Sequence, residues 1–261
     1  MEVVIEDQMI ERREIYSMSQ TAIITGSSRG IGRATARLFA EKGYQVMIHY
    51  HQAEQEALEL FRQLTDQQCQ VAICQADISD SRQVGKLIDK TMAAFGSVDV
   101  LVNNAGISQQ KLFTDITEAE WDTMMNVHIK GMFHSCQAVL PHMIYKKSGK
   151  IINLSSIWGI TGASCEVHYS TAKAAVIGFT KALAKELAPS NIHVNCVAPG
   201  IVDTDMNRFL SSEELQALRE DIPLQRLGTV EEIANCVYFL ASEQAGFITG
   251  QVISPNGGYV I

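Results

Sequence analysis

The 261-residue chain lacks an apolar run of the roughly 18 residues that a membrane span requires. Its first 19 residues also lack the apolar core and the small-residue cleavage site of a secretory signal peptide, and they are acidic near the start. The sequence therefore predicts a protein that does not cross a membrane. We expect residues 1–19 to be a poorly ordered N-terminal extension and residues 20–261 to form one domain.

Positive charge and patterned cysteines are also scarce. Lys and Arg number 21 against 29 Asp and Glu, and the net charge of -8 argues against a nucleic-acid-binding protein with a broadly basic face. The six cysteines form no C-x-x-C pair and no metal-ligand spacing with histidine, so we expect no metal site. Reduced, buried thiols are typical of the cytoplasm, which is the location that we predict.

What the sequence does contain is an alternation of short apolar runs with amphipathic stretches. The expected strands are 21–25, 45–49, 70–74, 98–102, 150–154, 192–197 and 250–254. The expected helices are 31–42, 55–67, 81–95, 118–143, 169–187, 213–221 and 230–240. Strands that are apolar on both faces and alternate with helices indicate a parallel sheet covered on both sides. We therefore expect an α/β fold, a doubly wound Rossmann-type domain with seven parallel strands, whose ligands bind at the carboxyl ends of the strands.

Local signals agree with this order of elements. Asp80, Thr117 and Thr229 precede three of the helices and are typical helix N-caps. The stretch 201–226 interrupts the alternation with a mostly polar insertion. We interpret this insertion as a movable lid over the site.

A glycine-rich turn, Thr25-Gly-Ser-Ser-Arg-Gly-Ile-Gly32, follows the first strand and opens the first helix. Gly26 permits a tight turn, Gly30 lets the backbone approach a pyrophosphate, and Gly32 allows close packing of helix on strand. The phosphates of a dinucleotide would then rest on the helix N-terminus. The turn therefore predicts a dinucleotide site.

Two further positions bear on which dinucleotide binds. The end of the second strand, at Tyr50, has no carboxylate to hold the ribose hydroxyls of NAD. Arg29, within the turn, instead suits a 2′-phosphate, so we expect NADPH (NADP+) as the cofactor. Asp77 follows the third strand, where it can accept a hydrogen bond from the adenine amine or cap a helix.

A second group of residues predicts chemistry on a carbonyl or an alcohol. Tyr169 precedes Lys173 by four residues, which puts both side chains on one face of a helix. The Lys173 ammonium would there lower the pKa of Tyr169 from about 10 and make it a general acid or base. Ser156, 13 residues before Tyr169, would hydrogen-bond the carbonyl oxygen. Beside a nicotinamide, these three residues predict an oxidoreductase.

Together with Asn103-Asn-Ala-Gly106 and Pro199-Gly200, these segments resemble the short-chain dehydrogenase/reductase family over residues 20–261. The resemblance implies a homotetramer, with dimer contacts made by the two long helices on either side of the Ser156 strand. It also implies the catalytic positions, which are Ser156, Tyr169, Lys173 and His128. The residues expected to bind the cofactor are Gly26, Ser28, Arg29, Gly30, Ile31, Gly32, Tyr50, Asp77, Ile78, Asn103, Ala105, Gly106, Tyr169, Lys173, Pro199, Gly200, Ile201 and Thr204.

His128 departs from the family pattern, which usually has Asn in a Val-Asn-x-x-Gly context. In the family, this Asn helps to hold a water that links the Lys to a proton wire. In the segment Val127-His-Ile-Lys-Gly131, the backbone carbonyl can hold the water while His128 is tolerated, or His128 can join the wire as a titratable group. A further alternative is an NADP-binding regulator that has lost turnover, although the intact Ser156, Tyr169 and Lys173 argue against it.

Within the family, the chain is most similar to the 3-oxoacyl-[acyl-carrier-protein] reductases of fatty acid synthesis, in segments 181–187, 194–200 and 248–258. Such enzymes offer basic residues to an acidic carrier protein. The candidates here are Lys146, Lys147 and Lys150, which a solvated turn would explain equally well. We therefore predict an NADPH-dependent reductase of a small acyl or keto substrate carried on acyl carrier protein.

The segment 155–169 also resembles a subgroup that reduces a 5-aminopentanone modification on elongation factor P. Trp158, Cys165, Glu166 and His168 would then flank the substrate mouth. Glu166 would meet the cationic amine, which a fatty acyl substrate lacks. This reductase is the close alternative, and a steroid or sugar dehydrogenase has no specific support in the sequence.

Overall fold

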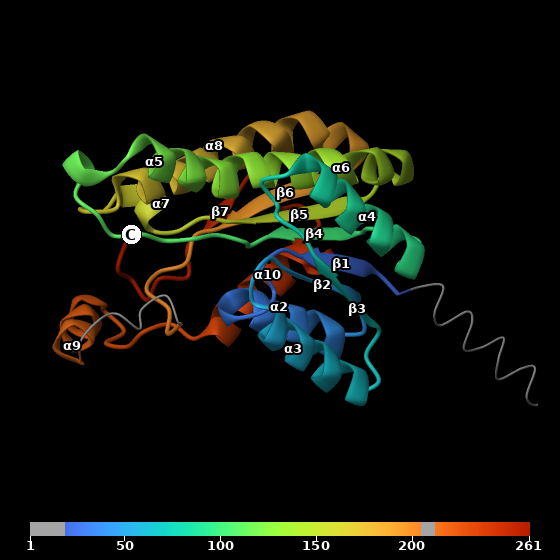
Figure 1. Ribbon diagram of the computed structural model, residues 1–261, viewed down its shortest axis with the longest axis horizontal. Helices are drawn as coiled ribbons and strands as arrows, with labels where there is room; N and C mark the ends of the chain where they lie inside the picture. The colour runs from blue at the N-terminus through green and yellow to red at the C-terminus, as the bar shows by residue number, and fades with distance from the viewer. Residues whose placement is uncertain (1–18, 205–211) are drawn as a thin grey trace, which may run out of the picture.

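A computed structural model describes residues 19–204 and 212–261 (Figure 1). They form a seven-stranded sheet in which every pair is parallel, in the order β3-β2-β1-β4-β5-β6-β7. The strands are Thr21–Ile24 (β1), Gln45–Tyr50 (β2), Val71–Gln75 (β3), Val100–Asn103 (β4), Gly149–Leu154 (β5), Ile192–Val197 (β6) and Val252–Ile253 (β7). The predicted doubly wound Rossmann-type α/β fold is confirmed. Apart from Ser19, the predicted N-terminal extension lies outside the described residues.

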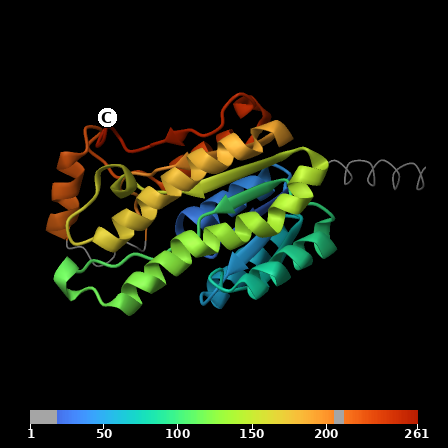
Figure 2. The same cartoon turned by 90° about the horizontal axis from the view of Figure 1, so that it is seen from above.

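Helices cover both faces of the sheet (Figure 1). One face carries α2 (Gly30–Glu41), α3 (Glu54–Asp66) and α10 (Val230–Ala241). The other carries α4 (Ser81–Phe95), α6 (Gly131–Lys146) and α8 (Val167–Leu187), and Figure 2 shows α6 and α8 running lengthwise over it. Toward the carboxyl ends of the strands lie α5 (Glu118–Met125), α7 (Trp158–Thr161), α9 (Ser212–Asp221) and the C-terminus (Figure 1). Short 3₁₀ turns occupy Phe113–Asp115, Ala188–Ser190 and Glu243–Ala245.

The stretch expected as one helix, 118–143, is three segments. A π-helical turn, η2 (Asn126–Lys130), separates α5 from α6. π turns insert an extra residue into a helix and are frequent at functional sites. The apolar periodicity of the stretch carries no signal of this insertion, and the single-turn helix α7 is equally absent from the predictions. The turn matters because it contains His128.

The three predicted helix caps are confirmed. The Asp80 carboxylate accepts a hydrogen bond from a backbone N–H in the first turn of α4. Thr117 and Thr229 each form a capping box, with Glu120 and Glu232 respectively. Such caps satisfy N–H groups that have no partner inside the helix.

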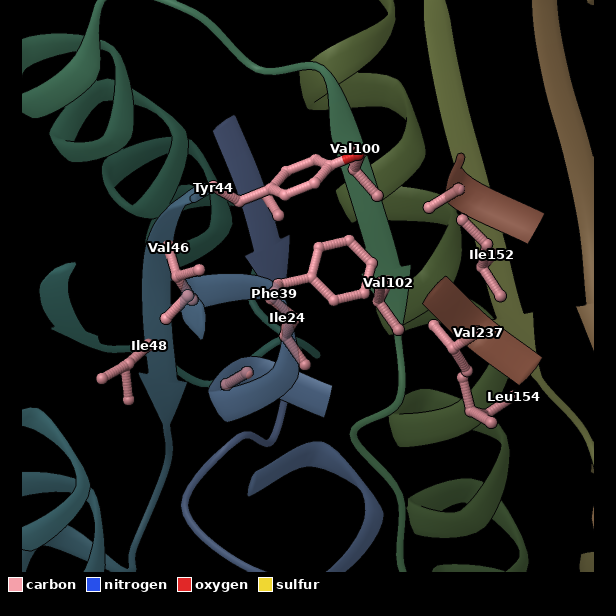
Figure 3. Packing of buried hydrophobic residues seen from close by; sticks show 14 of the residues in the cluster. Ile24, Phe39, Tyr44, Val46, Ile48, Val100, Val102, Ile152, Leu154 and Val237 are labelled. Carbon is pink, nitrogen blue, oxygen red and sulfur yellow. The ribbon is translucent and has the colours of Figure 1, made fainter. Parts of the chain in front are cut away.

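Two apolar layers hold the strand ends in place. Successive β1 residues point to opposite faces, so that Ile24 belongs to the layer under α2 and α10, and Ile23 to the layer under α4, α6 and α8. In the first layer, Phe39 from α2 and Val237 from α10 pack over the sheet (Figure 3). Burial of one such side chain contributes roughly 1.5–3 kcal/mol.

No helix in the described part of the chain is both long and apolar enough to cross a membrane.

Candidate active site

The strand order reverses between β1 and β4, because β1 pairs with β2 on one side and with β4 on the other. Ligands of doubly wound sheets bind at such a point, outside the carboxyl ends of the strands. The glycine-rich turn follows β1, and the turn 103–106 follows β4. The fold therefore brings the two predicted cofactor segments to one crevice.

The glycine-rich turn leaves no room for a side chain at Gly26 or Gly32. Gly26 has a φ of +66°, and a Cβ there would lie 2.8 Å from Ala105 Cα. A Cβ on Gly32 would lie 2.3 Å from Gly26 O, so α2 packs directly on the turn. Arg29, the N-cap of α2, makes no side-chain capping bond, and the first N–H groups of the helix stay available to an anion. The cradle thus fits the diphosphate of a dinucleotide.

Thr25 and Asn104 lock this turn to the end of β4. Thr25 Oγ1 accepts hydrogen bonds from the backbone N–H groups of Asn104 (3.0 Å) and Ala105 (3.1 Å). In return, Asn104 Nδ2 donates to Thr25 O (2.9 Å) and Gly26 O (3.1 Å). Asn104 is not among the site residues expected from the sequence, although it lies within the Asn-Asn-Ala-Gly segment.

His49 is a second anchor that the sequence analysis missed. Its Nδ1 accepts a hydrogen bond from Gly26 N (2.9 Å), and its Nε2–H donates to Ala76 O (3.0 Å). Burial lowers the pKa of His49 to about 4, so the ring is neutral near pH 7. This imidazole ties the glycine-rich turn to the end of β3. A histidine directly after the apolar run Val46-Met-Ile48 was the available signal.

At the expected adenine end, Asp77 is held by its neighbours. Its Oδ1 accepts hydrogen bonds from Ser79 N (2.9 Å) and Ser79 Oγ (2.7 Å), and His51 Nε2 lies 3.8 Å from Oδ2. Burial alone would raise the pKa of Asp77, but the Ser79 hydrogen bonds and His51 outweigh it and lower the pKa. Asp80, and not Asp77, caps α4. The buried Ile78 side chain lies against the backbone of Gly131.

At the expected nicotinamide end, the loop after β6 is fixed on two sides. Pro199 O accepts a hydrogen bond from Ile157 N (2.9 Å), and Gly200 N donates to Pro255 O (3.0 Å). Thr204 Cγ2 would lie 3.9 Å from a Cβ on Gly30, so this loop meets the glycine-rich turn. The lid interpretation of 201–226 stays a prediction, since 205–211 lie outside the described residues.

Ser156, Tyr169 and Lys173 gather at the end of β5 and on α8. Tyr169 is half-buried, and burial of its hydroxyl raises its pKa. The charge of Glu166 raises this pKa further, and a hydrogen bond with Ser156 acts in the opposite direction. Tyr169 is therefore protonated at neutral pH.

The spacing of Tyr169 and Lys173 predicted a lowered pKa for Tyr169, but burial raises this pKa overall. Lys173 Nζ donates to Leu154 O (2.8 Å) and lies 5.5 Å from the centroid of the Tyr169 ring. Burial lowers the pKa of Lys173 itself to about 8. Burial is thus the largest cause of the pKa shift of both groups. Ser155 holds Lys173 from the other side, because Ser155 Oγ donates to Lys173 O (2.7 Å).

His128 is buried within η2. Its Nε2 lies 2.8 Å from Ile107 O and 3.2 Å from Ile107 N, so one of these backbone groups is bound whichever tautomer is present. Burial, together with the charge of Lys173, lowers the pKa of His128 to about 3. A Cβ on Gly106 would lie 2.5 Å from His128 Cε1. The imidazole is therefore neutral and already engaged, which favours a positioning role over a titratable relay.

A small pocket, partly open to solvent, lies at this edge of the sheet. Its lining comes from the ends of β1, β4 and β5, from the loop after β3, from η2, and from α6 and α8. The lining residues are Thr25, Ile78, Asn103, Ala105, Val127, His128, Met132, Leu154 and Val176.

Within the ranges 19–204 and 212–261, no group of three or more His, Cys, Asp or Glu side chains is arranged to hold a metal.

Two expectations about the substrate mouth are wrong. His168 is fully buried, and its Nε2 lies 3.0 Å from Gln109 Oε1, so it does not face the mouth. Lys146, Lys147 and Lys150 lie at the amino ends of the strands, where Lys146 forms an ion pair with the buried Asp99. They are at the opposite edge of the sheet from the site, because β5 begins beside them and ends at Leu154.

Dinucleotide-dependent oxidoreductases are the class that this fold and this site define. A family model described as "Enoyl-(Acyl carrier protein) reductase" matches residues 26–260. The chain belongs to the short-chain dehydrogenase/reductase family.

Curated relatives cover most of the chain. The 3-oxoacyl-[acyl-carrier-protein] reductase FabG of Staphylococcus epidermidis is 43% identical over 241 residues, which are 92% of this chain and 99% of the relative. FabG of Staphylococcus aureus is 42% identical over 241 residues, 92% of this chain and 98% of the relative. FabG of Chlamydia muridarum is 42% identical over 242 residues, 92% of this chain and 97% of the relative.

Proposed function

We propose that the protein is an NADPH-dependent 3-oxoacyl-[acyl-carrier-protein] reductase of fatty acid synthesis. The observation that carries the proposal is the protonated Tyr169 beside Ser156 and Lys173 at the cofactor crevice. A phenol that keeps its proton at neutral pH can donate it, which is the direction of carbonyl reduction. The FabG relatives support the choice of substrate.

Each of these side chains has its own role in the proposed carbonyl reduction. When bound, the nicotinamide cofactor supplies the hydride that reduces the carbonyl carbon. Ser156 hydrogen-bonds the carbonyl oxygen and orients it, and Tyr169 donates its phenolic proton to that oxygen. Lys173, held by Leu154 O, stabilises the negative charge left on Tyr169. His128 holds the backbone of the loop that follows β4.

NADPH, rather than NADH, is supported by the residues around the expected adenosine ribose. Arg29 is exposed at the N-cap of α2, where its guanidinium can pair with a 2′-phosphate. Tyr50 ends β2, at a position where NAD enzymes carry a carboxylate. The Glu54 carboxylate is nearby in the first turn of α3, but it accepts a hydrogen bond from Tyr50 Oη (3.2 Å).

The remaining expected cofactor contacts would be made around the same crevice. Gly26, Ser28, Gly30, Ile31 and Gly32 would surround the phosphates, and Asp77 and Ile78 would border the adenine. Asn103, Ala105 and Gly106, together with Pro199, Gly200, Ile201 and Thr204, would border the ribose and nicotinamide. These residues lie at the start of α2 and at or just beyond the carboxyl ends of β1, β3, β4 and β6.

The proposal includes a homotetrameric assembly and a cytoplasmic location. A homotetramer is supported by large apolar side chains exposed on α6, namely Phe133, Ile144 and Tyr145, and near the last strand by Phe247. All six cysteines are free thiols, which supports the cytoplasm as the location.

A 5-aminopentanone reductase acting on elongation factor P is the second candidate. Glu166 favours it, because this half-buried carboxylate lies three residues before Tyr169 and accepts a hydrogen bond from Gln110 Nε2 (3.3 Å). Burial raises the pKa of Glu166, and a cationic amine beside it would offset that cost. A fatty acyl group offers no such cation.

The deciding experiment measures NADPH oxidation with acetoacetyl-acyl carrier protein, with NADH in a parallel reaction. Rapid turnover with NADPH alone would support the main proposal. Turnover only with 5-aminopentanone-modified elongation factor P, lost in Glu166→Gln, would favour the second candidate. Tight NADPH binding without oxidation on either substrate would indicate a regulator instead.

A further inference from the structure

An aromatic pair joins the proposed carbonyl-binding serine to the end of the chain. Trp158 begins α7, and its backbone N–H donates to Ser156 Oγ (3.2 Å). The Trp158 indole packs edge-to-face on the Tyr259 ring, with centroids 5.8 Å apart and an interplanar angle of 81°. Both side chains are half-buried, so the pair lies at the surface of the site.

Tyr259 belongs to a C-terminal tail, residues 254–261, that is built around one side chain. Asn256 Oδ1 accepts hydrogen bonds from Gly258 N (2.8 Å) and Val260 N (3.5 Å). Asn256 Nδ2 donates to Val260 O (2.8 Å) and Ser254 Oγ (2.9 Å). These bonds close the tail into a turn and fix the backbone position from which the Tyr259 side chain projects.

The tail is seated on the loop at the expected nicotinamide end. Pro255 O accepts a hydrogen bond from Gly200 N (3.0 Å), and Ser254 Oγ donates to Ala198 O (2.8 Å). A Cβ on Gly200 would lie 2.7 Å from Asn256 Cα, so the two backbones are in direct contact. The tail therefore has a fixed position relative to the cofactor crevice.

The other side of the tail meets the segment after α9. Leu224 N donates to Gly257 O (3.1 Å), and a Cβ on Gly257 would lie 2.7 Å from Ile222 Cγ2. The tail ends at the C-terminus labelled in Figure 1. It is thus held between this segment and α7. Leu224 and Ile160 of α7 are exposed there, at 63% and 46%. Together with the aromatic pair, they offer apolar surface to an acyl chain.

We propose that Tyr259 is a positioning residue for the acyl part of the substrate and acts by holding Trp158 beside Ser156. The inference rests on the proposed reductase function and names the element that recognises the acyl group. Without the Tyr259 ring, the Trp158 indole loses its edge-to-face partner and moves among other rotamers. The apolar surface next to the reacting carbonyl is then no longer preformed.

The test compares Tyr259→Ala with Tyr259→Phe, which keeps the ring and removes only the hydroxyl. Steady-state kinetics with acetoacetyl and longer 3-oxoacyl thioesters give kcat and KM, and a titration gives the Kd of NADPH. Tyr259→Ala is expected to raise KM about three- to tenfold, more for the longer chain, with kcat and the NADPH Kd unchanged. Tyr259→Phe is expected to behave like the wild type.

Unchanged KM values in Tyr259→Ala would overturn the inference, and so would an equal loss of NADPH binding, which would show a general structural role. A second measurement separates the inference from the proposed function. In a Trp121→Phe background, Trp158 fluorescence reports thioester binding without turnover. If the wild type binds a thioester but does not reduce it, the proposed reductase function fails, and the ratio of thioester Kd between Tyr259→Ala and wild type still decides the inference. If no thioester binds, both are wrong.

Discussion

The imidazole of His128 packs edge-to-face against the phenol ring of Tyr169, with ring centroids 5.6 Å apart and an interplanar angle of 83°. The same imidazole binds the backbone of Ile107 through Nε2. His128 therefore holds the loop after β4 and the ring of the proposed proton donor in one arrangement. A neutral ring with its Nε2 engaged is suited to this role.

Removal of the imidazole should slow catalysis without changing its pH dependence. His128→Ala removes the hydrogen bond that holds the Ile107 backbone, and we expect kcat to fall about tenfold. His128→Asn, which restores the amide usual in the family, should stay within about threefold of the wild type. Pre-steady-state rates from pH 5 to pH 8 check this. A relay role would instead show a titration in the wild type that both variants lack.

Acid stability should depend on two of the buried imidazoles, those of His49 and His128. Burial lowers the pKa of His128 to about 3 and that of His49 to about 4, while both have the ordinary value of 6.5 when unfolded. Between these values the unfolded chain binds more protons, so stability falls as the pH drops below about 6.5, by up to about 1.4 kcal/mol per pH unit for each ring. Urea unfolding at pH 7, 6 and 5 measures this slope. His128→Asn should remove one of the two contributions, and an unchanged slope would contradict the assignment.

Tyr169→Phe should separate cofactor binding from chemistry. The variant keeps the ring against His128 but cannot donate a proton, so we expect NADPH binding to persist and turnover to fall by about two orders of magnitude. NADPH titration and single-turnover reduction of a 3-oxoacyl thioester provide the two readouts. A variant that retained nearly full activity would refute the proposed mechanism.

Arg29→Ala should change the choice of dinucleotide. Loss of one charge-assisted contact with the 2′-phosphate is expected to raise the Kd of NADPH by about tenfold or more and to leave that of NADH unchanged. Fluorescence titration with both dinucleotides checks this, and Arg37→Ala, on the exposed side of α2, is the matched control. Equal weakening of both dinucleotides would place Arg29 at the shared diphosphate instead.

The sequence predicted best those features that depend on local pattern. Strands with apolar residues on both faces, the caps Asp80, Thr117 and Thr229, and the turn from Gly26 to Gly32 each have a short-range physical cause. The same holds for the approach of Tyr169 and Lys173 on one helix.

The features that the sequence did not predict depend on distant parts of the chain. The raised pKa of Tyr169 results from burial by several elements, which spacing along one helix cannot report. The anchoring of Gly26 by His49 joins neighbouring strands, and the position of Lys146 away from the site follows only from the direction of β5. The π turn around His128 breaks a helix whose periodicity is otherwise continuous.

The contact between Lys173 and Leu154 bears on how much rearrangement the proposed reaction would need. The Lys173 side chain is bound to Leu154 O, and Ser155 binds the Lys173 backbone carbonyl, so two consecutive residues of the β5 end hold one residue of α8. A free lysine side chain has roughly 1.5–2 kcal/mol of rotamer entropy to lose when it is fixed. Here that loss is part of folding, so the Lys173 side chain is fixed before any ligand binds.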